Sequence, residues 1–245
     1  MEIELFKILP LVFLTAAFYS SVGHGGASGY LALMSLLGIS SLYMRSSALI
    51  LNLFVSAIAF YQFYKAGYFR WKLFYTFAAA SIPMAFIGAN ITLDPVWYNR
   101  ILGLFLIIAA LRLTGIFNFN NSDTVNELPV RTGLIIGAVL GLLSGMIGIG
   151  GGIILSPVIL LFGWGNIKET AAVSALFIFV NSFSGLLGLG ILNLNLSSTF
   201  IWWIMAAIAG GSLGSLWGSR FAKSFVLKNV LALVILVAAF KLILV

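Results

Sequence analysis

The stretch SGMIGIGGG, residues 144–152, places five glycines within nine residues. It interrupts an apolar run that extends from about residue 133 to residue 162. That run is longer than the roughly 20 apolar residues of a single membrane-spanning helix. Glycine lets a chain leave helical geometry at little steric cost. The stretch therefore predicts a break inside a membrane-embedded segment, with a helical arm on each side.

The composition of the whole chain also predicts a membrane location. Of its 245 residues, 62% are hydrophobic and 8% are charged, whereas an average soluble domain has roughly 25% charged residues. A soluble protein needs more polar side chains to cover its surface. Soluble enzymes, secreted domains and disordered tails are therefore excluded. The apolar runs lack the alternation of a membrane barrel, so an all-α polytopic membrane protein is predicted.

The apolar runs divide into two halves with a polar stretch between them at residues 118–129, which is typical of a linker. The predicted membrane runs cover residues 5–37, 48–64, 73–91 and 96–113 in the first half, and 133–162, 171–192, 200–218 and 225–244 in the second. We therefore expect a first membrane repeat at 1–117, the linker at 118–129 and a second membrane repeat at 130–245.

The two halves resemble each other in sequence. The glycines at 23–27 match those at 148–152 with an offset of 125, and residues 106–113 match 235–242 with an offset of 129. Two matches in the same order favour a duplication. If each broken run turns back as a hairpin, or crosses the membrane twice, each half crosses an odd number of times and the second half is inverted.

The basic residues favour this inverted arrangement. It places nine of them on one face and four on the other, whereas a single crossing for each broken run gives seven and six. The face with more Lys and Arg is usually cytoplasmic. We therefore predict inverted repeats, each with a glycine-broken helical hairpin plus three transmembrane helices. Both termini are expected outside the inner cell membrane.

Two matched breaks predict a binding site for a small anion. Many secondary transporters are inverted repeats with broken helices. Backbone N–H groups freed at a break find no partner in lipid, and an anion can satisfy them. Glycines that only let helices pack closely are the alternative. This alternative explains isolated pairs such as Gly210 and Gly214 better than it explains three adjacent glycines.

The candidate substrate-binding residues are the break glycines and polar residues within the apolar runs. They are Gly23, His24, Gly25, Gly26, Ser28, Arg45, Asn52, Gly148, Gly150, Gly151, Gly152, Ser174 and Asn181. No catalytic residue and no metal ligand is predicted.

Each polar candidate also has a structural alternative. His24, the only histidine, suits anion binding or proton coupling, or it stabilises the break as a neutral hydrogen-bonded ring. Arg45 attracts the substrate or is an interfacial anchor. Asn52 and Asn181 line the pocket or join helices by hydrogen bonds. The pair Ser156-Pro157 leaves two starting points open for the helix after the second break, at residue 153 or 156.

These motifs resemble the TauE/SafE sulfite exporter family, also called the toluene sulfonate uptake permease family. The resemblance rests on residues 144–152 with Ser156-Pro157, on TAAVSAL at 170–176, and on the first-half counterparts at 23–29 and 45–52. It covers nearly the whole chain. It implies secondary transport of sulfite, organosulfonates or related sulfur-containing anions. The first copy reads GHGGASG and departs from the glycine pattern, so the anion and the share of each copy stay open.

Three functions were compared. We predict a secondary transporter that works by alternating access, and an anion channel built on the same pocket is the alternative. An intramembrane enzyme is not expected, because His24 lacks an evident carboxylate partner and the chain has no second histidine. No cofactor is predicted. The expected partners are a small anionic substrate, the lipid bilayer and a coupling ion, either a proton or sodium. Nucleic acid is not expected, and a homodimer stays open.

Overall fold

The computed structural model describes residues 8–36, 41–91, 126–190, 200–227, 229, 230, 232, 233 and 236. Within these ranges the regular structure is entirely helical, which confirms the predicted all-α class. The elements are α2 (Leu9–Ser21), α3 (Ala27–Leu36), α4 (Ser41–Lys65), α5 (Trp71–Ala89), α7 (Val130–Ile147), α8 (Gly152–Leu161), α9 (Ile167–Leu189), α10 (Phe200–Leu216) and the π-helical turn η2 (Trp217–Phe221).

Five of the described helices are long and apolar enough to cross a membrane. They cover Tyr43–Lys65, Trp71–Ala89, Val130–Ile147, Ile167–Leu189 and Phe200–Phe221. Large apolar side chains such as Phe18, Ile135 and Met205 are exposed on the outside, as a surface in contact with lipid requires. These findings confirm a multi-pass membrane protein. The predicted runs at 96–113 and, for the most part, 225–244 lie outside the described residues.

The second glycine break is a hairpin. The backbone N–H of Asn126, just before α7, donates to the carbonyl oxygen of Gly163, just after α8, at 2.8 Å. The chain therefore enters and leaves this hairpin at the same end. Helix α8 has only ten residues, about 15 Å at the usual rise, which is too short to span a membrane.

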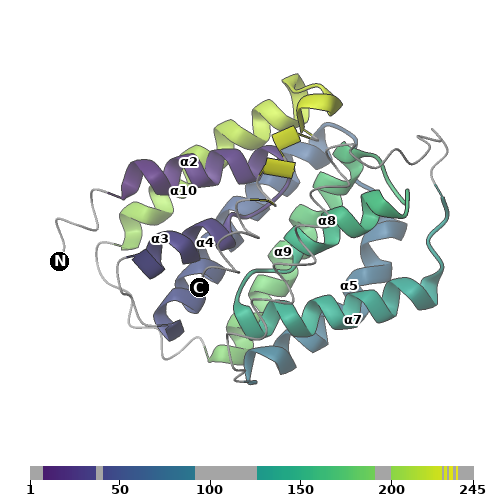
Figure 1. Ribbon diagram of the computed structural model, residues 1–245, viewed down its shortest axis with the longest axis horizontal. Coiled ribbons are helices and arrows are strands. Elements are labelled where there is room, and N and C mark those ends of the chain that lie inside the picture. The colour runs from purple at the N-terminus through teal and green to yellow at the C-terminus, as the bar shows by residue number, and fades with distance from the viewer. Residues whose placement is uncertain are drawn as a thin grey trace.

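The first glycine break has the same form. Helices α2 and α3 have 13 and 10 residues, and the hydroxyls of Tyr19 and Ser28 join them at 2.8 Å. In Figure 1 both helices extend from the break toward the same end of the molecule. The glycine-broken hairpin predicted for each half is confirmed.

Helix α8 begins at Gly152, so the start at residue 156 is wrong and the break is short. Pro157 lies inside the helix, where it removes one backbone donor. Helix α9 starts with a complete capping box, in which the Asn166 side chain and Glu169 bond each other's backbone N–H groups. The loop between α8 and α9 is therefore fixed at both ends.

The two halves are intertwined. Helix α2 of the first half packs along α10 of the second, and α5 of the first packs along α7 of the second (Figure 1). The central helices α4 and α9 pack against each other. Exchanging the two halves reproduces the same set of pairs, which agrees with a duplicated chain.

Glycines bring these paired helices close together. On α7, a Cβ at Gly137, Gly141 or Gly145 would lie 2.0–2.2 Å from a backbone carbonyl oxygen of α5. A Cβ at Gly210 or Gly214 on α10, or at Gly218 in η2, would lie 1.9–2.2 Å from one of α2. The close-packing interpretation is therefore correct for these glycines.

Several loops meet at one end of the molecule. Arg70 donates to the carbonyl oxygen of Trp164 at 3.0 Å, and the ammonium of Lys168 donates to that of Ser219 at 3.4 Å. Together with the contact between Asn126 and Gly163, these bonds bring four segments to the same end: the α4–α5 loop, the chain before α7, the α8–α9 loop and η2.

Candidate functional site

The two breaks share an unusual backbone. The first break (residues 22–26) has positive φ angles at Gly23 (78°) and Gly26 (93°). The second break (residues 148–151) has them at Gly148 (83°), Gly150 (77°) and Gly151 (74°). Residues with side chains rarely adopt this left-handed region. The glycines therefore set the chain geometry, as the sequence predicted.

Asn52 on α4 joins the two breaks. Its buried side-chain oxygen accepts a hydrogen bond from the backbone N–H of Ala27, at the start of α3, at 3.0 Å. Its amide nitrogen donates to the carbonyl oxygen of Ile149, in the second break, at 3.2 Å. The same nitrogen lies 3.4 Å from the hydroxyl of Ser182 on α9. One side chain thus holds both breaks on the central helices.

His24 connects the first break to the second hairpin. Its Nε2 lies 3.0 Å from the carbonyl oxygen of Gly152 and 2.9 Å from the hydroxyl of Ser156. The Ser156 hydroxyl lies 2.8 Å from that of Ser174 on α9. Only 1% of His24 is exposed. The structure therefore brings two predicted site residues, His24 and Ser174, into one buried chain through Ser156.

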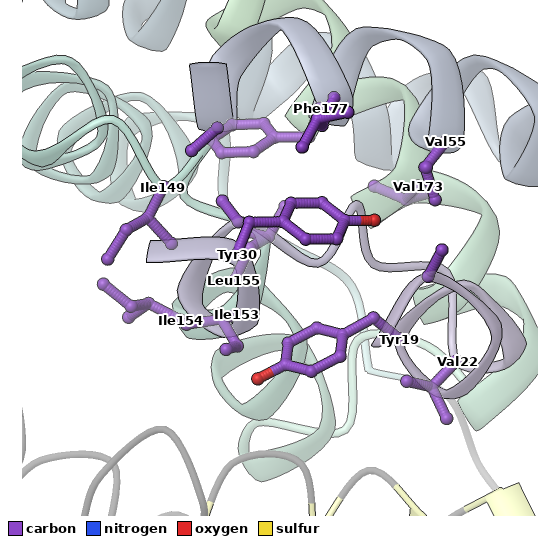
Figure 2. Packing of buried hydrophobic residues seen from close by; sticks show 14 of the residues in the cluster. Tyr19, Val22, Tyr30, Val55, Ile149, Ile153, Ile154, Leu155, Val173 and Phe177 are labelled. Atoms are coloured by element: carbon purple, nitrogen blue, oxygen red, sulfur yellow. The ribbon is translucent and has the colours of Figure 1, made fainter. Parts of the chain in front are cut away.

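A small pocket lies where the breaks meet. It is lined by Tyr19, His24, Gly25, Gly26, Ala27, Ser28, Ile149, Ile153 and Ile178. Figure 2 shows Tyr19, Tyr30, Ile149 and Ile153 in this region. None of the described residues that line it is an Asp, Glu, Lys or Arg. The pocket combines polar groups of the first break with apolar walls from the second half.

Both breaks contain glycine N–H groups without a partner among the described residues. Within the described part of the chain, no hydrogen-bond partner is found for the N–H groups of Gly25, Gly26, Gly150, Gly151 and Gly152. Helices α3 and α8 both begin here, and helix N-termini carry partial positive charge. This chemistry suits an anion.

The Arg45 guanidinium has other partners. Its Nη2 donates to the carbonyl oxygens of Ala89 at 3.3 Å and Gly145 at 2.9 Å. These are the ends of α5 and α7, where a cation suits the helix dipoles. The backbone of Arg45 lies next to Gly148, with a built Cβ there 3.3 Å from Arg45 Cα. Arg45 is thus beside the second break but is not among the residues that line the pocket.

Asn181 also bonds away from the breaks. Its amide nitrogen donates to the carbonyl oxygen of Phe177, one turn earlier in α9, at 2.8 Å. Its side-chain oxygen is buried and has no partner among the described residues. Of the predicted residues, the structure groups the break glycines, His24, Ser28, Asn52 and Ser174, whereas the polar groups of Arg45 and Asn181 bond elsewhere.

Two residues of the site were missed as candidates. Ser156 was considered only as a helix cap, yet it lies one turn after Gly152 and faces His24. Tyr19 bonds Ser28 across the first hairpin. A polar residue within one helical turn of a glycine break is the signal that identifies Ser156.

Comparisons with known proteins assign the chain to a family. The family model described as sulfite exporter TauE/SafE matches residues 8–242. A probable membrane transporter protein of Sinorhizobium fredii is 38% identical over 247 residues, which cover 99% of each chain. A probable membrane transporter protein of Methanocaldococcus jannaschii is 26% identical over 136 residues, which cover 54% of this chain and 50% of that protein.

No solved structure gives a significant match to the chain. The family is a class of membrane exporters and not of enzymes, which agrees with the prediction of a transporter. The family match spans both hairpins and the linker between the halves. The chain therefore belongs to the sulfite exporter TauE/SafE family and is a multi-pass membrane transporter.

Proposed function

We propose that the chain is a secondary transporter that moves small sulfur-containing anions across the membrane by alternating access. The substrates are sulfite, organosulfonates or related oxyanions, as the name of the family suggests. The observation that carries the proposal is the meeting of the two breaks at one pocket: Gly25 and Gly26 line it, and the second break contributes Ile149, next to the unpartnered N–H groups of residues 150–152. Asn52 holds these breaks together.

The electrostatics of the pocket favour an anion bound by backbone donors. The N-termini of α3 and α8 together provide partial positive charge, about half a unit each for a well-formed helix. The N–H groups of the break glycines then replace part of the anion's hydration shell. The pocket is small, so we propose that the breaks move apart to admit a sulfur oxyanion and close around it.

The intertwined packing indicates which parts move. A rocking motion of residues 1–117 against 130–245 would tear apart the close contacts of α2 with α10 and of α5 with α7. We propose that these two helix pairs are the moving units and that α4 and α9 are the support between them. The two sequence repeats are then units of duplication, while each moving pair takes one helix from each.

The same contacts support an orientation for the two halves. The second hairpin begins and ends where α4 ends and α5 begins, and we infer that the second half starts from the side opposite the first. This supports inverted repeats. That end also holds the basic residues Arg70, Lys72 and Lys168. We therefore propose that it faces the cytoplasm of an inner-membrane protein, with both termini outside.

The test is flux in liposomes that contain the purified protein. Sulfite, sulfate, thiosulfate, taurine and sulfoacetate are compared for uptake and for exchange against the same anion inside. Saturable exchange of at least one anion is expected. Exchange of none of them contradicts the substrate class, and ohmic current without saturation contradicts alternating access in favour of a channel.

Two glycine variants locate the site. In Gly150→Ala the added Cβ lies 2.9 Å from Asn52 Nδ2, so we expect at least about a tenfold loss of exchange. Gly67→Ala is the matched control, because Gly67 has a similar φ of 82° but nothing within 4 Å of the added Cβ. Equal activity in both variants contradicts the proposed site.

A further inference from the structure

The hydrogen bonds of His24 fix its tautomer. A carbonyl oxygen only accepts hydrogen bonds, so the short contact of Nε2 with the Gly152 oxygen assigns the proton of a neutral ring to Nε2. The Ser156 hydroxyl accepts from the same N–H and lies 2.8 Å from the hydroxyl of Ser174. In this neutral tautomer the other ring nitrogen, Nδ1, carries a lone pair and no proton.

Nδ1 is buried without a partner. No hydrogen bond to it is found among the described residues, although the ring is 1% exposed and lines the pocket. A bare lone pair repels an anion, whereas an N–H at the same position donates to it. With His24 in this neutral tautomer the site lacks one donor, and a single proton on Nδ1 supplies it.

The charged and titratable side chains of the surrounding described helices do not supply this missing donor. Tyr19 on α2 bonds Ser28, and Tyr30 on α3 is the other titratable group near the first break. Helix α8 has no titratable residue, and α4 contributes Asn52 while Arg45 caps α5 and α7. On α9, Lys168 and Glu169 bond Tyr68 and Arg70.

The charge of a buried anion thus has no cation to balance it among the described residues that line the pocket. Burying an unpaired charge is costly. A proton taken up with the anion reduces this cost and adds a charge-assisted hydrogen bond. The same reasoning disfavours sodium, because none of the described lining residues offers a carboxylate.

Resting on the proposed function, we infer that His24 takes up a proton at Nδ1 when the anion binds, so that each anion crosses the membrane together with one proton. The proton comes from the solvent on the side of loading and returns to solvent on the side of release. His24 is thereby the coupling group of the transporter.

Thiosulfate tests this inference, because it stays ionised near neutral pH and any accompanying proton must be on the protein. Wild-type protein is placed in liposomes with the membrane potential clamped at zero and a pH-sensitive dye trapped inside. Adding external thiosulfate should acidify the interior. An acidic outside should raise accumulation about tenfold per pH unit, as one proton per anion requires.

Two variants separate coupling from binding. His24→Asn places an amide donor near the position of Nδ1, so exchange of thiosulfate should persist within about tenfold of wild type while accumulation driven by pH falls to a ratio of about one. His24→Gln keeps a donor for the Gly152 oxygen but has nothing that takes up a proton, so it should also lose pH-driven accumulation. Gly67→Ala should retain both thiosulfate exchange and pH-driven accumulation.

The outcomes distinguish this inference from the function on which it rests. Wild-type exchange without a change of interior pH, or accumulation driven by sodium, overturns proton coupling and leaves the transporter proposal intact. Continued pH-driven accumulation in either His24 variant overturns the role of His24. Absence of any exchange by wild-type protein overturns both proposals.

Discussion

Asn52 and Asn181 occupy equivalent positions of the two repeats, 129 residues apart, but make different contacts. Asn52 bonds Ala27 and Ile149 and so joins both breaks. Among the described residues, Asn181 bonds only its own helix and its side-chain oxygen has no partner. The breaks differ in the same way, because His24 of the first corresponds to Ile149 of the second. The two breaks are thus similar helix ends with different side chains, and the pocket between them has two unlike sides.

The largest effect should come from the first glycine of the first break, and a smaller one from its counterpart in the second break. At Gly23, which has a positive φ, a Cβ would lie 2.1 Å from the backbone oxygen of Ala171, whereas at Gly148 the nearest atom is 3.3 Å away. We expect Gly23→Ala to cost about 4 kcal/mol or more and prevent recovery of folded protein. Gly148→Ala should cost about 1–3 kcal/mol, mainly from backbone strain.

The yield of folded protein after purification in detergent measures the effect of Gly23→Ala. Thermal unfolding in detergent measures Gly148→Ala and any Gly23→Ala protein that is recovered, with Gly67→Ala as the control for strain alone. Equal loss of stability in Gly23→Ala and Gly148→Ala would show that the first break does not pack on α9 as described.

The next largest effect on stability is expected from the two asparagines, whose alanine variants should differ. Asn52→Ala removes the side-chain partners of the Ala27 N–H and the Ile149 carbonyl, and we expect it to lower the free energy of unfolding by about 2–4 kcal/mol. Asn181→Ala removes one local bond and an unpaired oxygen, so about 1 kcal/mol or less is expected. Denaturation of both variants under the same conditions checks this, and a reversed order contradicts the bridging role of Asn52.

The intertwined helix pairs should respond alike. Gly141→Ala on α7 and Gly214→Ala on α10 each push a Cβ into a neighbouring backbone, at an expected cost of about 1–3 kcal/mol. Gly185→Ala is the control, since its nearest contact would be an ordinary 3.4 Å to Leu49. A large loss of stability in Gly185→Ala, or in only one of the two test variants, would contradict the equivalence of the two helix pairs.

The smallest effect is expected at Ser182. Its hydroxyl lies 3.4 Å from Asn52 Nδ2, which is a weak contact beside the other two bonds of Asn52. Ser182→Ala should therefore change stability by less than about 0.5 kcal/mol and leave exchange within about twofold. A larger loss of exchange would mean that Ser182 contacts the substrate.

The sequence predicted the hairpins because three adjacent glycines and a matched partner 125 residues away have few other structural uses. It also placed His24 and Asn52 near the breaks, since polar groups inside apolar runs need partners. It did not predict the exchange of helices between halves. Local patterns report which face of a helix packs closely, as at Gly210 and Gly214, but they do not identify the neighbouring helix.

The remaining differences between prediction and structure concern the groups that Arg45 and Ser156 bond in the folded protein. The sequence leaves Arg45 as a cation for the substrate or an interfacial anchor, and it does not predict that carbonyl oxygens at the ends of α5 and α7 accept from its guanidinium. Those ends lie 44 and 100 residues away in sequence, and only the fold brings them together. Ser156 was hidden for the same reason, because its partner His24 belongs to the other repeat.

The central claim is that both breaks together bind one anion. An experimental structure with selenite, the selenium analogue of sulfite, tests it most directly through the anomalous signal of selenium. We predict one selenium peak between the breaks, within hydrogen-bonding reach of the N–H groups of Gly25 or Gly26 on one side and of Gly150–Gly152 on the other. A peak beside Arg45 alone, or none at the breaks in a protein that exchanges sulfite, would contradict the account.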